Sequence, residues 1–452
     1  MTAAKTKNIP RDPVWYPFTQ MAEFLEASPL AIAAAEGCWL IDAAGNRYLD
    51  GVSSLWANVH GHRHPVIDAA VRAQLDRVAH STMLGLSHAG GIELARQLAE
   101  LAPAGLSRVF YSDSGATAVE IALKMAYQYW QLKGEHQKRL FLKMGEAYHG
   151  DTIGAVSLGG MDLFHERFGG LLFDSIKIPT PHLYRHPFGN CSEAEATQRF
   201  FDQSAAIIRQ HAGQACAVVV EPIMQGAAGM IVHPEGFLRH LRELTREHGL
   251  LLIADEVAVG FGRTGRMFAC EWEEVAPDLM CLGKGITGGY LPLAATLATE
   301  EIFSAFLGEF AELKTFFHGH TYTGNPLACV AALASLEIFR TERTLAPDVF
   351  GPKAAAYTAG MARLARLPHV GSARFRGLMG GVELVRNRES GEPYPFAERR
   401  GHQVALAARK HGVLLRPLGD VVVLLPPLAV SLAELEHLFY GAEKAIVAVT
   451  GS

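Results

Sequence analysis

The sequence predicts an α/β protein: a large domain with a mostly parallel sheet flanked by helices, and a small α+β domain. Between residues 106 and 298, short apolar runs alternate with longer helical patterns, as parallel strands and their crossover helices do. After residue 340 the spacing of strands and helices changes, which indicates a second unit. At about 150 residues per domain, the 452 residues allow two or three domains.

The composition is typical of a globular protein, with 49% apolar and 19% charged residues. Lys and Arg number 41 against 46 Asp and Glu, a net charge of −5, and no basic cluster favours nucleic acid or an anionic membrane surface. Six cysteines form no C-x-x-C pair, and no apolar run is long enough to span a bilayer. We therefore expect a cytoplasmic protein with small-molecule substrates and no nucleic-acid or membrane partner.

The large domain is predicted from apolar runs that are almost continuous, as in strands covered on both faces. The predicted strands span residues 108–112, 139–143, 216–221, 250–256, 279–283 and 293–299. Helical patterns over 115–132 and 236–248 lie between them, and a long helical stretch over 323–340 follows.

The small domain is predicted from the pattern of the C-terminal part. Its elements are a strand at 378–384, a helix at 399–410, strands at 413–416 and 421–425, and a helix at 432–449. Two runs at 37–41 and 47–50 flank a polar turn and predict a hairpin that packs on this unit. The predicted division is an N-terminal segment 1–60 packing with the small domain, a large cofactor-binding domain 61–335 and a C-terminal small domain 336–452.

Two ionisable residues end predicted buried strands. Lys284 stands between two glycines, and an amine in such a pocket suits Schiff-base chemistry with a carbonyl cofactor, although a solvated surface lysine fits the local sequence as well. Asp255 ends the run 250–256, where a buried carboxylate needs a partner. A protonated pyridine nitrogen would be such a partner, and so would an arginine or the next loop.

Two further motifs follow predicted strands. Gly115 and Ala116 open the helix 115–132, whose N-terminus could bind phosphate; plain capping by Ser114 and a box Thr117-x-x-Glu120 is the alternative. Tyr148 precedes His-Gly and could lie against a planar cofactor, although an aromatic residue beside glycine is more often only packed.

Two patterns are interpreted as decoys. Residues 260–265 match G-x-G-x-x-G, but the preceding strand ends four residues earlier and no amphipathic helix follows, which argues against dinucleotide binding. The histidines at 60, 62 and 64 lack carboxylates or cysteines at ligand spacing, and Arg63 would repel a cation, so we expect no metal.

In this chain order the motifs resemble the class III aminotransferases of fold type I, which use pyridoxal 5′-phosphate. The resemblance runs from Trp15 to about Pro427 and is strongest within 253–285. Within the class it is closest to the branch of biotin synthesis that converts 8-amino-7-oxononanoate to 7,8-diaminononanoate. Its further motifs are Asp50-Gly51-Val52-Ser53-Ser54, His60-Gly61-His62, Ser112-Asp113-Ser114-Gly115, Tyr148-His149-Gly150-Asp151-Thr152, Gln225-Gly226-Ala227, Phe268-Ala269-Cys270-Glu271 and Gly324-Asn325-Pro326-Leu327-Ala328-Cys329.

The resemblance implies roles for individual residues. Lys284 would be catalytic, bonding the cofactor and moving the proton, and Asp255 would pair with the pyridine nitrogen. The other residues implied to bind the cofactor are Gly115, Ala116, Tyr148 and Gln225, with His320 and Thr321 from the second subunit of a homodimer. The residues implied to bind substrate are Arg416, which would hold its carboxylate, with Tyr148, Phe18, Leu55, Trp56 and Gly319.

Three departures from the branch leave the amino donor open. Members that take the amine from S-adenosylmethionine usually have Trp-His-Pro-Tyr where this chain has 15–18, Trp-Trp where it has 55–56, and Gly-Pro-Thr where it has 319–321. The donor is therefore S-adenosylmethionine, the default of the branch, or L-lysine. A broad ω-amino-acid:pyruvate aminotransferase is a further alternative. A scaffold without catalysis has no need of Lys284 or Asp255, which this chain retains.

Overall fold

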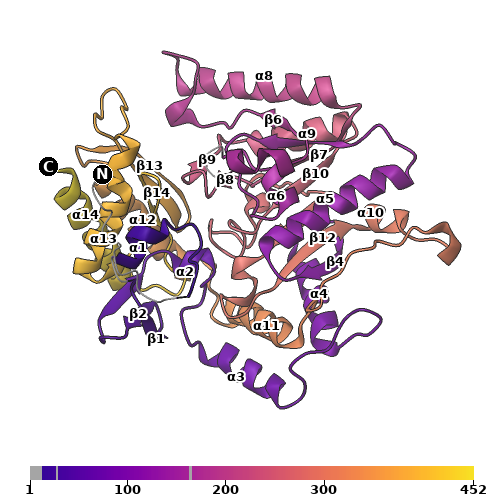
Figure 1. Ribbon diagram of the computed structural model, residues 1–452, viewed down its shortest axis with the longest axis horizontal. Coiled ribbons are helices and arrows are strands. Elements are labelled where there is room, and N and C mark those ends of the chain that lie inside the picture. The colour runs from indigo at the N-terminus through magenta and orange to yellow at the C-terminus, as the bar shows by residue number, and fades with distance from the viewer. Residues whose placement is uncertain (1–12, 27–28, 162–164, 452) are drawn as a thin grey trace, which may run out of the picture.

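A seven-stranded sheet forms the centre of the computed structural model, which describes residues 13–26, 29–161 and 165–451 (Figure 1). The strand order is β4 (Leu106–Ser112), β12 (Ala294–Thr299), β11 (Leu279–Leu282), β10 (Leu251–Asp255), β7 (Ala215–Val220), β5 (Leu140–Met144) and β6 (Ile176–Ile178). Every residue of β7, β10 and β11 is buried, as continuous apolar strands covered on both faces should be.

Helices cover both faces of this sheet. Ile253 packs in one cluster with residues of α5 (Gly115–Leu132), whereas its neighbour Leu252 packs in another with residues of α9 (Phe237–Glu247). Because successive strand residues point to opposite faces, these helices lie on opposite sides of the sheet. The remaining helices of this part are α3 (Pro65–Leu75), α4 (Ala89–Leu101), α6 (Ile153–Ser157), α8 (Glu193–His211), α10 (Glu300–Ala305) and α11 (Pro326–Thr341).

The predicted mostly parallel sheet is confirmed, but β12 runs antiparallel to both of its neighbours, β11 and β4. The apolar run gave no sign of this direction. The link from β11 to β12, residues 283–293, is shorter than the dozen or more residues that a parallel crossover needs. The chain therefore turns back on itself beside the strand that precedes Lys284.

A second sheet lies on the C-terminal side of the molecule, with the order β13 (Val370–Arg376), β14 (Met379–Leu384), β17 (Val421–Leu424) and β16 (Arg416–Leu418). Three helices accompany it: α12 (Pro347–Leu364), α13 (Arg400–Ala408) and α14 (Leu432–Thr450). The sequence interpretation did not include α12 or β13. A proline at position 352 inside α12 obscures its pattern.

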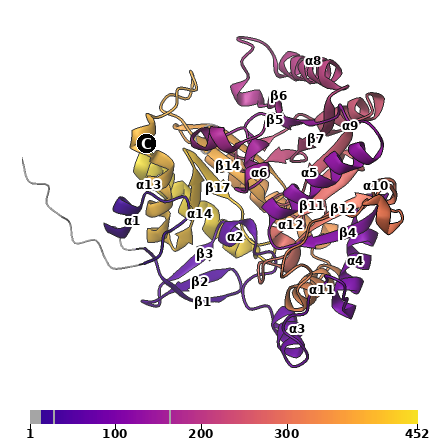
Figure 2. The same ribbon diagram turned by 45° about the vertical axis from the view of Figure 1, so that its right-hand side comes forward.

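The N-terminal hairpin packs on the C-terminal part, as predicted. Strands β1 (Ile32–Glu36), β2 (Trp39–Asp42) and β3 (Arg47–Asp50) lie side by side (Figure 2). The fourth strand of their sheet is β15 (Val413–Leu414), which runs parallel to β3. The single strand predicted over 413–416 is therefore wrong. The chain leaves this sheet after Leu414 and enters the second sheet at Arg416, which pairs with Val423.

The predicted division at residues 60 and 335 stays a prediction; its second boundary would fall inside α11. The first twelve residues of the predicted segment 1–60 lie outside the described residues. Within the described ranges, no helix is long and apolar enough to cross a membrane.

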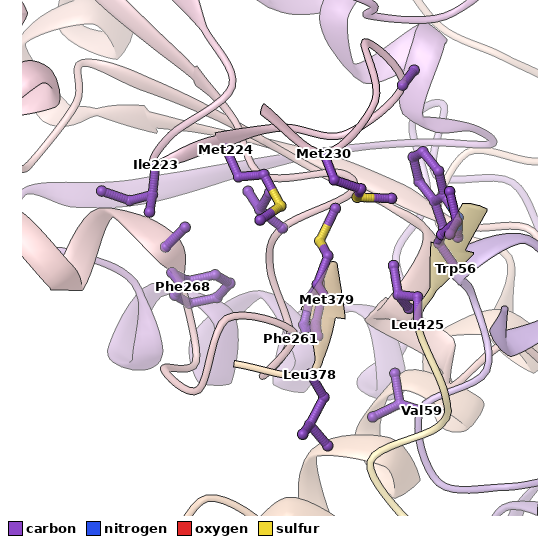
Figure 3. Close-up of a cluster of buried hydrophobic side chains, with 14 of the residues drawn as sticks. Trp56, Val59, Ile223, Met224, Met230, Phe261, Phe268, Leu378, Met379 and Leu425 are labelled. Atoms are coloured by element: carbon purple, nitrogen blue, oxygen red, sulfur yellow. The ribbon is translucent and has the colours of Figure 1, made fainter. Parts of the chain in front are cut away.

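A shared apolar core joins the two parts of the molecule. Figure 3 shows side chains from distant segments meeting in it, among them Trp56, Met230, Met379 and Leu425. Met230 precedes β9 (Ile231–Val232), which pairs with β8 (Met224–Gln225) beside the large sheet. Trp56 is 7% exposed and lies at the edge of this core, where it also faces the cavity described next.

Candidate active site

A cavity of about 460 Å³ lies where strands β5, β7 and β10 end and helix α5 begins. It brings together six predicted site residues: Trp56, Gly115, Ala116, Tyr148, Asp255 and Lys284. Ligands of open α/β sheets bind at this position, outside the carboxyl ends of the strands. One chain therefore brings together the predicted lysine, the predicted aspartate and the predicted phosphate-binding helix end.

The N-terminus of α5 is capped and also has N–H groups to spare. Ser114 and Thr117 form a capping box in which Ser114 Oγ accepts the Thr117 N–H (3.4 Å) and Thr117 Oγ1 accepts the Ser114 N–H (3.0 Å). The first N–H groups of a helix have no partner within it, so those of Gly115 and Ala116 can bind an anion. A side chain at position 115 would collide with Val257, so only glycine fits there.

The predicted capping box Thr117-x-x-Glu120 is wrong for Glu120, which does not cap α5. Glu120 does not return to its own helix. Its Oε1 accepts the N–H groups of Gly154 (2.7 Å) and Ala155 (3.2 Å) at the start of α6. Glu120 therefore fixes the segment that follows the Tyr148 motif.

Asp255 is held by a histidine at the floor of the cavity. His149 Nδ1 lies 2.7 Å from Asp255 Oδ2, and Val257 donates its N–H to Oδ1 (3.0 Å). Burial opposes a charge on His149, but the hydrogen bond and charge of Asp255, with the charge of Glu221, raise the pKa of His149 above its ordinary value. The pair gives Asp255 a fixed orientation.

Glu256, the second acid of the motif, has the loop-capping role that was one alternative for Asp255. Its two carboxylate oxygens accept the N–H groups of Ala269 (2.9 Å) and Cys270 (2.8 Å). Burial raises the pKa of Glu256 to about 7. Glu256 does not line the cavity, whereas Asp255 does. Of the two adjacent acids, Glu256 therefore fixes a loop and Asp255 faces the site.

Lys284 lies in the cavity and not on the outer surface. Burial lowers its pKa below the ordinary value, and the nearby carboxylates of Asp255 and Glu221 oppose this. Its Nζ is 5.1 Å from the centre of the Trp56 ring. An amine with a lowered pKa beside an aromatic wall is the environment in which lysine becomes a nucleophile or a base.

These residues fit pyridoxal 5′-phosphate. Free N–H groups at Gly115 and Ala116 suit its phosphate, the oriented carboxylate of Asp255 suits a protonated ring nitrogen, and Lys284 supplies the amine. Within the described part of the chain, His149 Nε2 is buried without a hydrogen-bond partner on the side facing away from Asp255. The donor set is therefore that of an anionic, aromatic, carbonyl-bearing ligand.

Tyr148 lines the cavity, and its hydroxyl donates to Asp151 Oδ2 (2.8 Å). Gln225 does not line it: its amide donates to Gly145 O (2.8 Å) and its oxygen meets His233 Nε2 (3.2 Å). The sequence interpretation gave no role to Glu221, which does line the cavity. Glu221 directly follows the apolar run of β7, the same signal that singled out Asp255.

Arg416 and Phe18 line a second cavity of about 1180 Å³ between the N-terminal segment and the second sheet. Arg416 is close enough to Tyr148 to oppose the rise in the pKa of that hydroxyl, which burial and Asp151 cause. Tyr148 lines the first cavity and Arg416 the second, so the charge of Arg416 acts between them. The wall of the larger cavity contains both cations and carboxylates, such as Arg399 and Asp420.

Trp56 reaches the first cavity from an unusual backbone turn. Residues 53–56 all have left-handed φ angles, between 47° and 69°, which cost energy in residues other than glycine. The buried guanidinium of Arg263 donates to Trp56 O (3.0 Å) and Asn58 O (2.8 Å), and Asp50 accepts the Ser54 N–H (2.9 Å). The G-x-G-x-x-G segment thus holds a loop of its own chain. Leu55 is 49% exposed and lines neither cavity.

The segment 319–321 lies outside both cavities within one chain. His320 Nδ1 pairs with Asp113 Oδ2 (3.1 Å), while Gly319 and Thr321 are exposed. Their predicted roles stay predictions, as does that of Gln225. The three histidines of the suspected metal tract have separate partners, because His60 bonds Ser335, His62 bonds Asp50 and His64 bonds Glu342.

Comparison with known proteins agrees with this geometry. Among curated relatives, adenosylmethionine-8-amino-7-oxononanoate aminotransferase of Nitratidesulfovibrio vulgaris is 56% identical over 449 residues, covering 99% of this chain and 82% of the relative. The enzyme of that name from Geobacter sulfurreducens is 52% identical, covering 97% of this chain and 96% of its own.

Solved structures match the fold over nearly the whole chain. The crystal structure of adenosylmethionine-8-amino-7-oxononanoate aminotransferase from Methanocaldococcus jannaschii has a TM-score of 0.91 at 43% identity and covers 97% of both chains. An amine transaminase from an uncultivated Pseudomonas species, in its PLP-bound form, has a TM-score of 0.91 at 36% identity, covering 98% of this chain and 100% of its own. The family model for aminotransferase class-III matches residues 22–446. This chain belongs to the class III aminotransferases.

Proposed function

We propose that this class III enzyme is a pyridoxal-phosphate-dependent aminotransferase of biotin synthesis. It converts 8-amino-7-oxononanoate to 7,8-diaminononanoate, with S-adenosylmethionine as amino donor. The observation that carries the proposal is one cavity that joins Lys284, Asp255 and the N-terminus of α5. It occurs in a chain whose relatives of this activity are 50–56% identical over nearly the whole length.

The chain's own residues bind and orient the cofactor. The N–H groups of Gly115 and Ala116, with the positive end of the α5 dipole, bind the phosphate. Asp255, oriented by His149, pairs with the ring nitrogen and keeps it protonated. When bound, the cofactor withdraws electrons from the carbon that carries the amine.

Lys284 is the residue that moves the proton. Burial lowers the pKa of its amine, which increases the neutral fraction that can accept a proton at neutral pH. Trp56, beside its Nζ, excludes water from the reacting groups. Tyr148 forms another wall and, through its hydrogen bond to Asp151, keeps its hydroxyl in a fixed direction.

Arg416 binds the carboxylate of the keto acid, a task that suits the planar fork of a guanidinium. Its charge acts on Tyr148, so the rest of the substrate would extend toward the cavity that Tyr148 and Trp56 line. Phe18, Leu55 and Gly319 would contact the amino donor. The departures from the branch lie in their segments, so L-lysine stays the alternative donor.

The enzyme acts as a homodimer in the cytoplasm. Large apolar side chains stand exposed on two neighbouring stretches, with Leu84 at 63%, Leu86 at 60%, Phe310 at 92% and Phe317 at 74%. A second copy would cover them and bring His320 and Thr321 to the cofactor phosphate of its partner. All six cysteines are free, which suits a reducing compartment.

The test is a half-reaction. The purified holoenzyme is mixed separately with S-adenosylmethionine and with L-lysine, and the visible absorbance of the cofactor is followed as it accepts the amine. Loss of absorbance with S-adenosylmethionine alone, restored by the keto acid, supports the proposal. Loss of absorbance with L-lysine alone would show that lysine, and not S-adenosylmethionine, is the amino donor. A response to a simple ω-amine but to neither donor would overturn the biotin-synthesis assignment.

A further inference from the structure

Glu221 is a buried carboxylate of the cavity to which the mechanism above gives no role. It directly follows β7 and is 3% exposed. Within the described ranges it forms no salt bridge, and the charges of His149 and Asp255 both act on it. Lys284, which feels its charge in turn, also lines the cavity. Burying a carboxylate without a paired cation is costly, so its place calls for an explanation.

The two oxygens of Glu221 bond to two different loops. Oε1 accepts the Tyr148 N–H (3.2 Å) and Oε2 accepts the Gly226 N–H (2.8 Å). Tyr148 belongs to the loop after β5, whereas Gly226 begins the turn between β8 and β9. One side chain therefore joins loops that leave the sheet at different strands.

Each of these loops carries a wall of the site. Tyr148 supplies its own ring, which lines the cavity. The Gly226 turn supports the ring of Trp56, because a Cβ at position 226 would come within 3.0 Å of Trp56 Cζ3. The spacing between the two aromatic walls thus depends on what holds Gly226 relative to Tyr148.

We propose that Glu221 is a positioning residue that sets the width of the substrate site between Tyr148 and Trp56. It acts through the two backbone N–H groups that its oxygens accept, one from each loop. The inference rests on the proposed function for the identity of the substrate.

The test compares two variants of similar chemistry. In Glu221→Gln, only one oxygen remains, so one of the two N–H groups faces an amide NH₂. Glu273→Gln is the matched control: Glu273 is 5% exposed and accepts the N–H groups of Gly236 (2.9 Å) and Arg239 (2.8 Å), and it does not line the cavity. Both variants should lose a comparable amount of thermal stability.

Two readouts separate positioning from a merely structural role. In the Glu221→Gln holoenzyme, hydrogen exchange at the amides of Tyr148 and Gly226 should be about tenfold faster, and KM for the keto acid about tenfold higher, with a smaller change in kcat. In Glu273→Gln both quantities should match the wild type. If Glu221→Gln does not fold, Glu221→Asp replaces it, because the shorter side chain can reach only one of the loops.

Wild-type exchange and wild-type KM in a folded Glu221 variant would overturn the inference, whatever happens to its Tm. An equal rise in KM in Glu221→Gln and Glu273→Gln would also overturn it, since general loosening would then be the cause. If the wild type itself does not aminate the keto acid, the proposed function fails, and exchange at Tyr148 and Gly226 still decides the role of Glu221.

Discussion

Glu221 and Glu383 are buried to a similar degree, 3% and 6% exposed, yet their pKa values move in opposite directions. For Glu221, burial dominates and raises the pKa to about 7. For Glu383, burial acts in the same direction, but Arg374 and Arg185 outweigh it and lower the pKa below its ordinary value. The partner, and not the depth, decides the charge of a buried acid.

The two regions use this difference for different ends. Glu383 lies between two guanidiniums, with Arg374 Nη1 2.6 Å from its Oε2 and Arg185 on the other oxygen, so it ties the residues near 185 to β14. In the cavity, Glu221 and Asp255 share their surroundings with an amine and a histidine whose protons can move. A carboxylate fixed between two guanidiniums holds the fold together, whereas a cavity whose groups can exchange protons suits chemistry.

The largest expected effect is in the cavity and concerns activity alone. Lys284→Ala should lower kcat by at least about 10⁴-fold, because both the bond to the cofactor and the proton transfer are lost. The free energy of unfolding of the cofactor-free protein should stay the same or rise, since a buried amine is removed. Steady-state kinetics and urea unfolding measure the two quantities. Retained turnover would refute the role of Lys284.

A change in the cluster of Glu383, Arg374 and Arg185 should lower stability and leave activity nearly unchanged. Arg374→Met leaves Glu383 buried with one cation and should lower the free energy of unfolding by about 3 kcal/mol. Turnover at 25 °C should fall less than tenfold in the folded fraction. Urea unfolding with Arg366→Met as control, an exposed arginine, tests this. If Arg374→Met were as stable as the control, the cluster would not hold the fold.

The smallest effect is a difference in pH dependence. The pKa of Glu221 is about 7 in the folded protein against an ordinary 4.5. Between these two pH values the folded protein retains a proton that the unfolded protein loses. The contribution of Glu221 to the free energy of unfolding therefore falls as pH rises from 4.5 to 7. When the pH rises from 5 to 7, the free energy of unfolding of cofactor-free Glu221→Gln should therefore increase by about 2 kcal/mol relative to that of the wild type, whatever the deficit of the variant at pH 5.

For Glu383 the sign is opposite. Its folded pKa lies below 4.5, so its contribution is complete above that pH and is lost as pH falls through the folded pKa. The deficit of Glu383→Gln should therefore be constant between pH 5 and 7 and shrink only in more acidic solution. Urea unfolding at pH 3.5, 5 and 7 compares the variants, and parallel profiles would contradict the distinction drawn between the two acids.

Local patterns in the sequence predicted the elements that carry the site. The helix 115–132 was predicted with the bounds that α5 has, because its cap and its apolar spacing are local signals. Strand ends were predicted to within about two residues for β7, β10 and β11, and these ends place Asp255 and Lys284 at one edge of the sheet. A strand end that bears a charge was the most useful signal.

What the sequence could not predict depends on distant partners. The left-handed turn at residues 53–56 is held by Arg263, and no local pattern links the two. The same limit explains why Glu256 and Asp255 looked alike, although one of them meets the N–H groups of residues 269 and 270. The break at Leu415 likewise follows from two sheets competing for one run of residues.

The pairing of β3 with β15 has a consequence for biosynthesis. Leu49 is opposite Val413 and Asp50 is opposite Leu414. Strand β3 is therefore synthesised early, whereas its partner β15 is synthesised only near the end of translation. Until then the outer edge of β3 has no partner strand and is open to proteases, chaperones and incorrect strand pairing. A nascent chain stalled before residue 413 should therefore be degraded more rapidly than one released just after residue 424.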